Sequence, residues 1–177
     1  IDGVVESQFS AERQGSYYLV SLNRTSTDIR TVSIKRSMSQ FEDVFDYLST
    51  IFTYLQEQGI NYVNFPDSFL WGAQHILPAE EMFENGGGNC IDGTMLFSSI
   101  LEAFYLKPYV VLVPGHAFVA VAMGVDSDII IPIETTLIGT EATAWMALDA
   151  AIEQFDDDYE LVDIMAMREQ GVLPQPH

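Results

Sequence analysis

The stretch GGGNCIDG, residues 86–93, places three consecutive glycines in front of the only cysteine of the chain, Cys90. Apolar residues recur at helical spacing over residues 90–105, which predicts a helix that begins at this cysteine. The unpaired N–H groups and the positive end of a helix dipole favour the thiolate, the reactive form of cysteine. Glycines also let the backbone turn sharply and approach a substrate closely. Cys90 is therefore a candidate nucleophile, although a lone cysteine on an apolar helix is more commonly a small buried hydrophobe.

Three short apolar runs follow this helix, and they predict an antiparallel meander over residues 109–113, 117–123 and 128–133. His116 stands at the start of the second run, and Glu134 directly follows the third. A tight hairpin at residues 124–127 would bring the two side chains together. An imidazole can share the thiol proton, and a carboxylate can orient and stabilise the imidazole. His116 and Glu134 are thus candidates for the base and the orienting acid. Considered alone, His116 could equally be a turn residue and Glu134 a solvent-facing residue at the end of a strand.

The remaining segments complete a mixed pattern of helices and strands. Helices are predicted over residues 39–58 and 141–155, a returning strand over 159–165, a long connection over 60–80, and two edge strands or an extended arm at 17–22 and 30–34. No internal repeat is visible. We expect a single α+β domain over residues 39–177, preceded by an extension or edge strands over 1–38.

Composition excludes several classes of protein. The 177 residues are 48% hydrophobic, and they hold 26 acidic against 7 basic residues for a formal net charge of −19. Such a chain should fold, but it lacks the basic surface that nucleic acid or anionic lipid requires. No apolar run is long enough for membrane insertion. The excess of acidic residues leaves cationic partners open. The same excess together with the scarcity of lysine leaves a high-salt habitat open as well.

The sequence indicates neither a cofactor nor a metal site. Cys90 and His116 lack the paired spacing of metal ligands, and the aspartates at 156–158 lack the alternation of a calcium loop, so we interpret them as a solvated turn. A single cysteine permits no internal disulfide. The chain opens Ile1-Asp2-Gly3 without methionine, which we interpret as an excised part of a larger protein, extracytoplasmic or at the cell surface.

Three motifs together carry a resemblance to a known family. The segments GGNCIDG at 87–93, PGHAFV at 114–119 and IETT at 133–136 resemble bacterial and archaeal transglutaminase-like domains of the papain-like superfamily, and the likeness runs from about residue 41 to about residue 174. It implies a papain-like core in which the helix bearing Cys90 packs on an antiparallel sheet carrying His116 and the acid. It also implies Cys90 as nucleophile, His116 as base and then acid, and Glu134 as orienting carboxylate. That acid is commonly Asp in transglutaminases and Asn in papain-like proteases, so this Glu is one methylene longer than the former.

The resemblance adds Gln74 as a donor to the oxyanion hole, with His75 as a competitor. Asp92 is assigned to the helix dipole rather than to catalysis, and Trp71 and Trp145 line either a substrate groove or the core. The expected activity is cysteine-dependent acyl transfer on a protein or peptide substrate, with hydrolysis of a peptide or amide bond as the outcome. Crosslinking or deamidation by a transglutaminase is one alternative, and a catalytically silent interaction or structural module is another.

Overall fold

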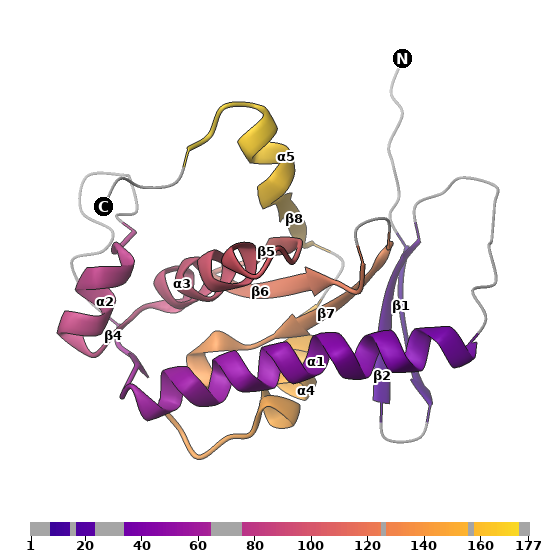
Figure 1. The fold of residues 1–177 in the computed structure, drawn as a ribbon, viewed down its shortest axis with the longest axis horizontal. Helices are drawn as coiled ribbons and strands as arrows, with labels where there is room; N and C mark the ends of the chain where they lie inside the picture. Colours follow the sequence, from indigo (N-terminus) through magenta and orange to yellow (C-terminus); the bar gives the residue numbers. More distant parts are fainter. Residues whose placement is uncertain are drawn as a thin grey trace.

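Helices and strands are mixed along the chain, and the helices lie around one main sheet (Figure 1). The structure, a computed structural model, describes residues 8–14, 17–23, 34–64, 76–124, 127–155 and 158–173. In chain order the elements are β1 (Gln8–Gln14), β2 (Tyr17–Asn23), α1 (Ile34–Glu57), β3 (Asn61–Tyr62), α2 (Ala79–Asn85), β4 (Gly87–Gly88), α3 (Cys90–Ala103), β5 (Pro108–Val113), β6 (His116–Ala122), β7 (Ile129–Ile133), the 3-10 helix η2 (Thr135–Leu137), α4 (Ala144–Gln154), β8 (Glu160–Asp163) and α5 (Ile164–Glu169).

The main sheet has six strands in the order β1-β2-β7-β6-β5-β8, and every neighbouring pair is antiparallel. The predicted meander is confirmed as β5-β6-β7. Val113 pairs with His116 across the β5–β6 turn, and Val119 pairs with Ile133 between β6 and β7. The α+β class is confirmed, with helices packed against an antiparallel sheet.

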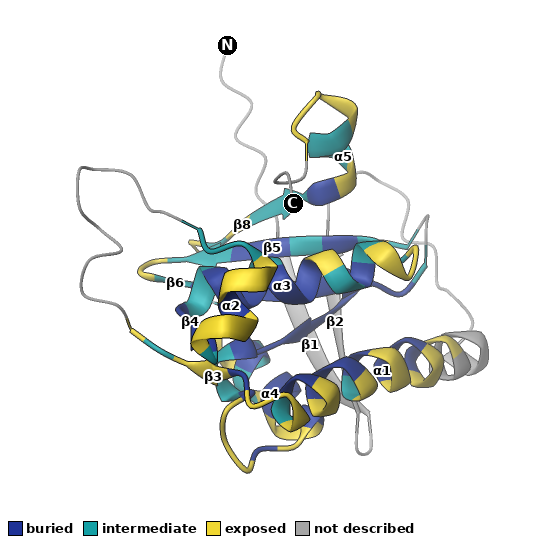
Figure 2. Cartoon of the chain, turned by 60° about the vertical axis from the view of Figure 1, so that its left-hand side comes forward, coloured by how far each residue is buried: buried dark blue, intermediate teal, exposed yellow. Residues whose placement is uncertain are grey.

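Apolar side chains bury β6 on both faces, which explains why this strand is an almost continuous apolar run. Val119 and Val121 belong to a large cluster with side chains of α1, α3 and α4, whereas Phe118 and Ala120 belong to a smaller cluster with Val111. Figure 2 shows the buried residues concentrated between the helices and the sheet. The strand that opens with His116 is therefore held from two sides.

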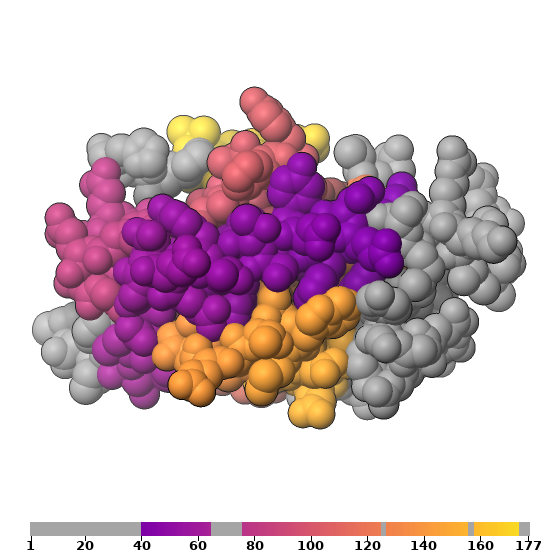
Figure 3. Space-filling model, turned by 60° about the horizontal axis from the view of Figure 1, so that its bottom comes forward, coloured from indigo at the N-terminus to yellow at the C-terminus, as the bar shows by residue number. Residues whose placement is uncertain are grey.

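The first helix follows the predicted pattern closely. All seven apolar positions of its predicted stripe are buried in α1, namely Phe41, Val44, Phe45, Leu48, Ile51, Phe52 and Leu55. The helix starts at Ile34, five residues before the predicted position 39. It lies beside α4, where the rings of Phe45 and Trp145 have centroids 4.0 Å apart, and the two helices form one continuous surface (Figure 3). None of the helices in the described ranges is both long and apolar enough to cross a membrane.

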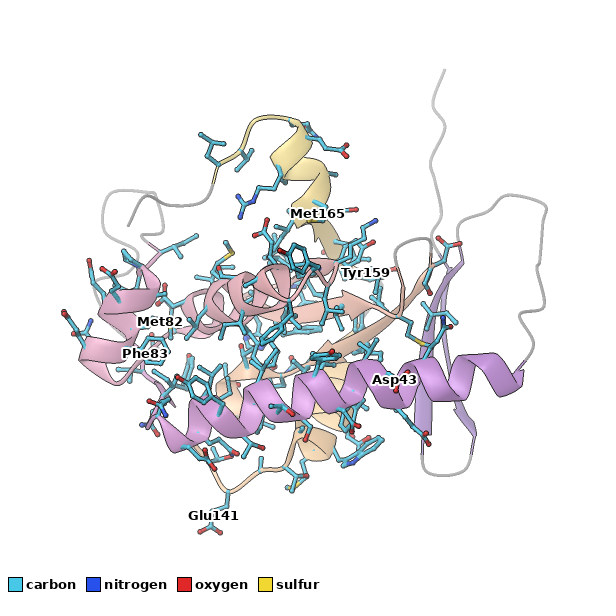
Figure 4. All side chains as sticks on the ribbon, in the orientation of Figure 1. Asp43, Met82, Phe83, Glu141, Tyr159 and Met165 are labelled. Carbon is cyan, nitrogen blue, oxygen red and sulfur yellow. The ribbon has the colours of Figure 1, made fainter. Side chains whose placement is uncertain are left out.

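Several predicted boundaries differ from the structure. The strand at 17–22 is β2, but β1 at the edge beside it was not predicted, and residues 30–33 of the other predicted strand lie outside the described residues. The predicted connection over 60–80 contains β3 and the start of α2; on that helix Met82 is buried and Phe83 exposed (Figure 4). The predicted strand over 159–165 ends early, at Asp163. The Asp163 carboxylate accepts a hydrogen bond from the Ala166 N–H at 3.0 Å, and this residue caps the start of α5.

Candidate active site

The N-terminus of α3 is held by a reciprocal cap directly before Cys90. The Asn89 side-chain oxygen accepts hydrogen bonds from the N–H groups of Ile91 at 3.0 Å and Asp92 at 3.2 Å, and Asp92 Oδ2 accepts one from the Asn89 N–H at 2.9 Å. This is a capping box, which satisfies donors that a helix start would leave unpaired. It fixes where the helix begins, and so fixes the cysteine in its first turn.

Asp92 does more than the dipole role expected of it. Its side chain is 1% exposed, and its second oxygen, Oδ1, accepts a hydrogen bond from the Leu77 N–H at 2.8 Å. A buried carboxylate needs partners on both oxygens, and the two backbone N–H groups provide them. Asp92 thereby ties the segment before α2 to the helix that carries Cys90.

The glycines before the cysteine make room for the protein itself. A Cβ on Gly88 would lie 2.6 Å from the Cβ of Asp92, so only glycine leaves space for the buried carboxylate. Gly87 has φ +148 and its backbone lies against that of Asn61, where a side chain would overlap the Asn61 carbonyl. The sequence argument assigned these glycines to substrate approach; in the structure the close approach is to Asn61 and Asp92.

Cys90 and His116 shift each other's pKa values in opposite directions. The hydrogen bond from the imidazole of His116 is the main reason that the pKa of the half-buried Cys90 thiol is lowered; burial opposes this effect, and the Ala117 N–H adds to it. The pKa of His116 is raised to about 10 by its hydrogen bond to Cys90 first and by Glu134 second. Opposite shifts of this kind favour a thiolate beside an imidazolium at neutral pH.

Glu134 occupies the other side of the imidazole. His116 Nε2 lies 2.7 Å from Glu134 Oε2, so Nδ1 is the nitrogen left for the cysteine. Continuing the β6–β7 register by one pair sets Glu134 opposite Phe118, two residues from His116 along the strand. Diagonal neighbours of this kind are about 7–8 Å apart, a span that long side chains can bridge. The extra methylene of a glutamate suits this diagonal reach.

The carboxylate is buried and fully engaged. Glu134 is 2% exposed, and its other oxygen, Oε1, accepts hydrogen bonds from the Thr136 N–H at 2.8 Å and the Thr136 hydroxyl at 2.7 Å. Burial raises the pKa of Glu134, but the hydrogen bonds from His116 and Thr136 together outweigh burial and leave the pKa below its usual value. Glu134 is therefore an anion that also caps the 3-10 helix η2.

The helix α3, which begins at Cys90, contacts the 3-10 helix η2, which follows Glu134. A Cβ on Gly93 would lie 3.3 Å from the Thr135 hydroxyl oxygen, tighter than usual, so glycine sets the closeness of α3 and η2. The Thr94 hydroxyl donates to the Cys90 carbonyl at 2.7 Å and lies 3.5 Å from the Thr135 hydroxyl. These contacts hold the start of α3, which carries Cys90, against the segment that follows Glu134.

The structure thus brings together Cys90, His116 and Glu134, the three residues proposed from the sequence. Gln74, His75 and Trp71 lie outside the described residues. Trp145 packs on α1 rather than beside the cysteine. Sequence reasoning missed Thr136, although a threonine two residues after an acid that ends a strand is a recognisable capping signal.

In the part of the chain that the structure describes, no three His, Cys, Asp or Glu side chains gather closely enough to hold an ion. The arrangement can hold a thiolate, protonate a leaving group and orient the imidazole that does so. Comparison of the chain with family models, curated proteins and solved structures found no match, so the argument for function rests on this geometry.

Proposed function

We propose that this chain is a cysteine-dependent acyl-transfer enzyme with a papain-like core of the transglutaminase-like type, acting on peptide or amide bonds. The observation that carries the proposal is the connected series from the Cys90 thiol through the imidazole to Glu134 Oε2, with the 2.7 Å contact at its far end. The order of the three residues along the chain and the opposite pKa shifts of Cys90 and His116 support it.

The chemistry follows from these positions. The Cys90 thiolate attacks the carbonyl carbon, a C–S bond forms, and the carbonyl electron pair moves to oxygen. When the tetrahedral species collapses, the C–N bond breaks and His116 gives its proton to the departing amine, leaving a thioester. Water then attacks the thioester carbonyl and His116 takes a proton from this water. The C–S bond breaks, Cys90 leaves as the thiolate together with a carboxylic acid, and the thiolate–imidazolium pair is restored. Glu134 holds the imidazole in place and balances its charge throughout.

One backbone donor stands ready for the developing oxyanion. Asn89 uses the N–H groups of Ile91 and Asp92, and its carbonyl takes the Gly93 N–H at 3.0 Å. Within the described ranges no acceptor occupies the Cys90 N–H. We propose that this N–H binds the oxyanion, with the Gln74 amide as the second donor that the family resemblance suggests. Removing one oxyanion-hole donor costs about 2.7–4 kcal/mol in an enzyme that uses similar acyl-transfer chemistry.

Hydrolysis is the acyl fate that we propose. The side chain of His116 is 21% exposed and Cys90 is half-buried, so water can reach the nitrogen that must activate it. Crosslinking would need a glutamine carboxamide as the acyl donor and an amine that attacks the thioester, whereas deamidation would need the same donor with water as the acceptor. Product analysis with and without an added amine separates these outcomes.

The test is labelling with a thiol-directed acyl probe, followed by product analysis with a peptide panel in the presence and absence of an added amine. Wild type should label and release carboxylic acid, whereas Cys90→Ala and His116→Ala should not. Ser99→Ala is the matched control, because Ser99 lies on the same helix with its exposed hydroxyl bonded only to the Met95 carbonyl among the described contacts. Labelling of wild-type Cys90 no faster than a free thiol would leave only a silent interaction module, and activity surviving in Cys90→Ala would refute the mechanism.

A further inference from the structure

Thr136 makes two contacts with the glutamate. Both hydrogen bonds to Glu134 Oε1 come from this residue, one from its N–H at 2.8 Å and one from its hydroxyl at 2.7 Å. The other oxygen, Oε2, is the one that lies against His116. Each carboxylate oxygen thus has its own partner, threonine on one side and imidazole on the other.

This division matters because a glutamate side chain has three torsions, and holding it in one rotamer costs conformational entropy. The hydroxyl and the N–H of Thr136 hold Oε1 from two directions, which leaves one orientation for Oε2. The same two donors occupy Oε1 with protons from threonine, so the carboxylate stays anionic when the imidazolium faces it. A carboxylate held in this way can orient the ring without taking its proton.

We propose that Thr136 is a positioning residue for the acyl-transfer site, and that its hydroxyl holds Glu134 in the single orientation that keeps His116 protonated and aimed at Cys90. This inference rests on the proposed function. Thr136 need not touch the substrate; it acts through the glutamate and the imidazole.

A simpler role for the Thr136 hydroxyl would be to stabilise the local backbone, and the turn that follows η2 contains a hydroxyl that does only this. The Thr140 hydroxyl donates to the Leu137 carbonyl at 2.7 Å and accepts from the Ala142 N–H at 3.1 Å, with no contact to Glu134. Thr140 is therefore the matched control. If turn stability were the whole function of Thr136, Thr136→Val and Thr140→Val should behave alike.

The experiment measures the rate of Cys90 alkylation by iodoacetamide between pH 5 and pH 10, which requires no substrate. Thr136→Val keeps the shape of the side chain and removes the hydroxyl. The hydroxyl acts on Cys90 only through Glu134 and the imidazole, so its loss should have the effect of one typical hydrogen bond. Alkylation should slow about five-fold at pH 6 and be unchanged at pH 10, where any thiol is ionised. Thr136→Ser restores the hydroxyl and should return the rate to within about two-fold of wild type, and Thr140→Val should match wild type.

A second comparison separates positioning from structure. In a His116→Ala background, Thr136→Val should leave alkylation unchanged, because the threonine acts through the imidazole. A further slowing in that background, or a wild-type pH profile in Thr136→Val alone, would overturn the inference. Circular dichroism checks each fold, and Thr136→Ala replaces Thr136→Val if the valine variant does not fold.

The two proposals fail in different ways. If wild-type Cys90 reacts no faster at pH 6 than a free thiol, the proposed function fails and this inference falls with it. If wild-type Cys90 is activated and Thr136→Val reacts equally fast, only the positioning role is lost.

Discussion

Replacing Glu134 with glutamine removes one negative charge from the site while keeping the shape of the side chain. The pKa of His116 rises from its usual 6.5 to about 10. The pKa difference is about 3.5, and each pH unit of difference corresponds to about 1.36 kcal/mol of free energy. The total is about 5 kcal/mol in favour of the imidazolium. The hydrogen bonds to Cys90 and to Glu134 are the two largest causes of this rise. A hydrogen bond to a charged group contributes about 1.5–3 kcal/mol, so we assign about 2 kcal/mol to Glu134. We therefore expect Glu134→Gln to weaken the thiolate–imidazolium pair about 30-fold.

The assay is iodoacetamide alkylation of Cys90 against pH, read by intact-mass spectrometry, with turnover of the best peptide measured in parallel. Alkylation below neutral pH should slow by about this factor, and the rate should recover in alkaline solution, where the thiol ionises unaided. Glu160→Gln is the control, since it removes the same charge from an exposed position on β8. An unchanged alkylation profile in Glu134→Gln would refute the assignment of Glu134 as the residue that stabilises the imidazolium.

Four further results are expected. Asp92→Asn should lower the free energy of unfolding by about 2 kcal/mol, seen in chemical denaturation, because an amide cannot accept from both the Leu77 and Asn89 N–H groups; an unchanged midpoint would contradict this. Gly93→Ala should reduce turnover about ten-fold by pressing on Thr135, with stability changing by less than about 1 kcal/mol because alanine favours the helix; full activity would show that the spacing of α3 and η2 is not critical. Because the pKa of Glu134 is lower in the folded chain than its unfolded value of 4.5, ionised Glu134 stabilises the fold above pH 4.5, and this contribution is lost as pH falls through the folded pKa. The difference in melting temperature between wild type and Glu134→Gln should therefore shrink in acid. A difference that grew in acid would contradict the lowered pKa. Finally, kcat/KM for lysine-rich peptides should fall as salt rises, given the net charge of −19, while neutral peptides serve as the control and an equal response of both would exclude steering.

The elements that the sequence predicted well are those whose own apolar pattern reports their packing. The stripe of α1 is buried at every predicted position because one face of that helix meets the core. By contrast α2 was missed, since Met82 is its single buried residue and one residue makes no period. The early start of α1 was missed for a related reason, because Lys35 and Arg36 carry no part of an apolar stripe.

The contacts of the candidate site also include some that the sequence predicts and some that it does not. His116 and Glu134 could be paired in advance because adjacent antiparallel strands bring the start of one near the end of the next. The contacts of Gly93 with Thr135 and of Asp92 with Leu77 could not, because they depend on how α3 crosses segments distant in the chain. Such crossings are set by tertiary packing, which no local spacing records.

The N-terminal hairpin affects how β7 meets solvent and other molecules. β2 pairs with β7 at Val20–Ile130 and Ser21–Ile129, and β1 lies beyond it. Without that hairpin, β7 would become the outermost strand, with three consecutive isoleucines at 129–131 and open backbone groups able to recruit a strand from another chain. β1 and β2 therefore cover the backbone edge of β7 at Ile129 and Ile130, and removal of these two strands should favour self-association and aggregation of the shortened protein.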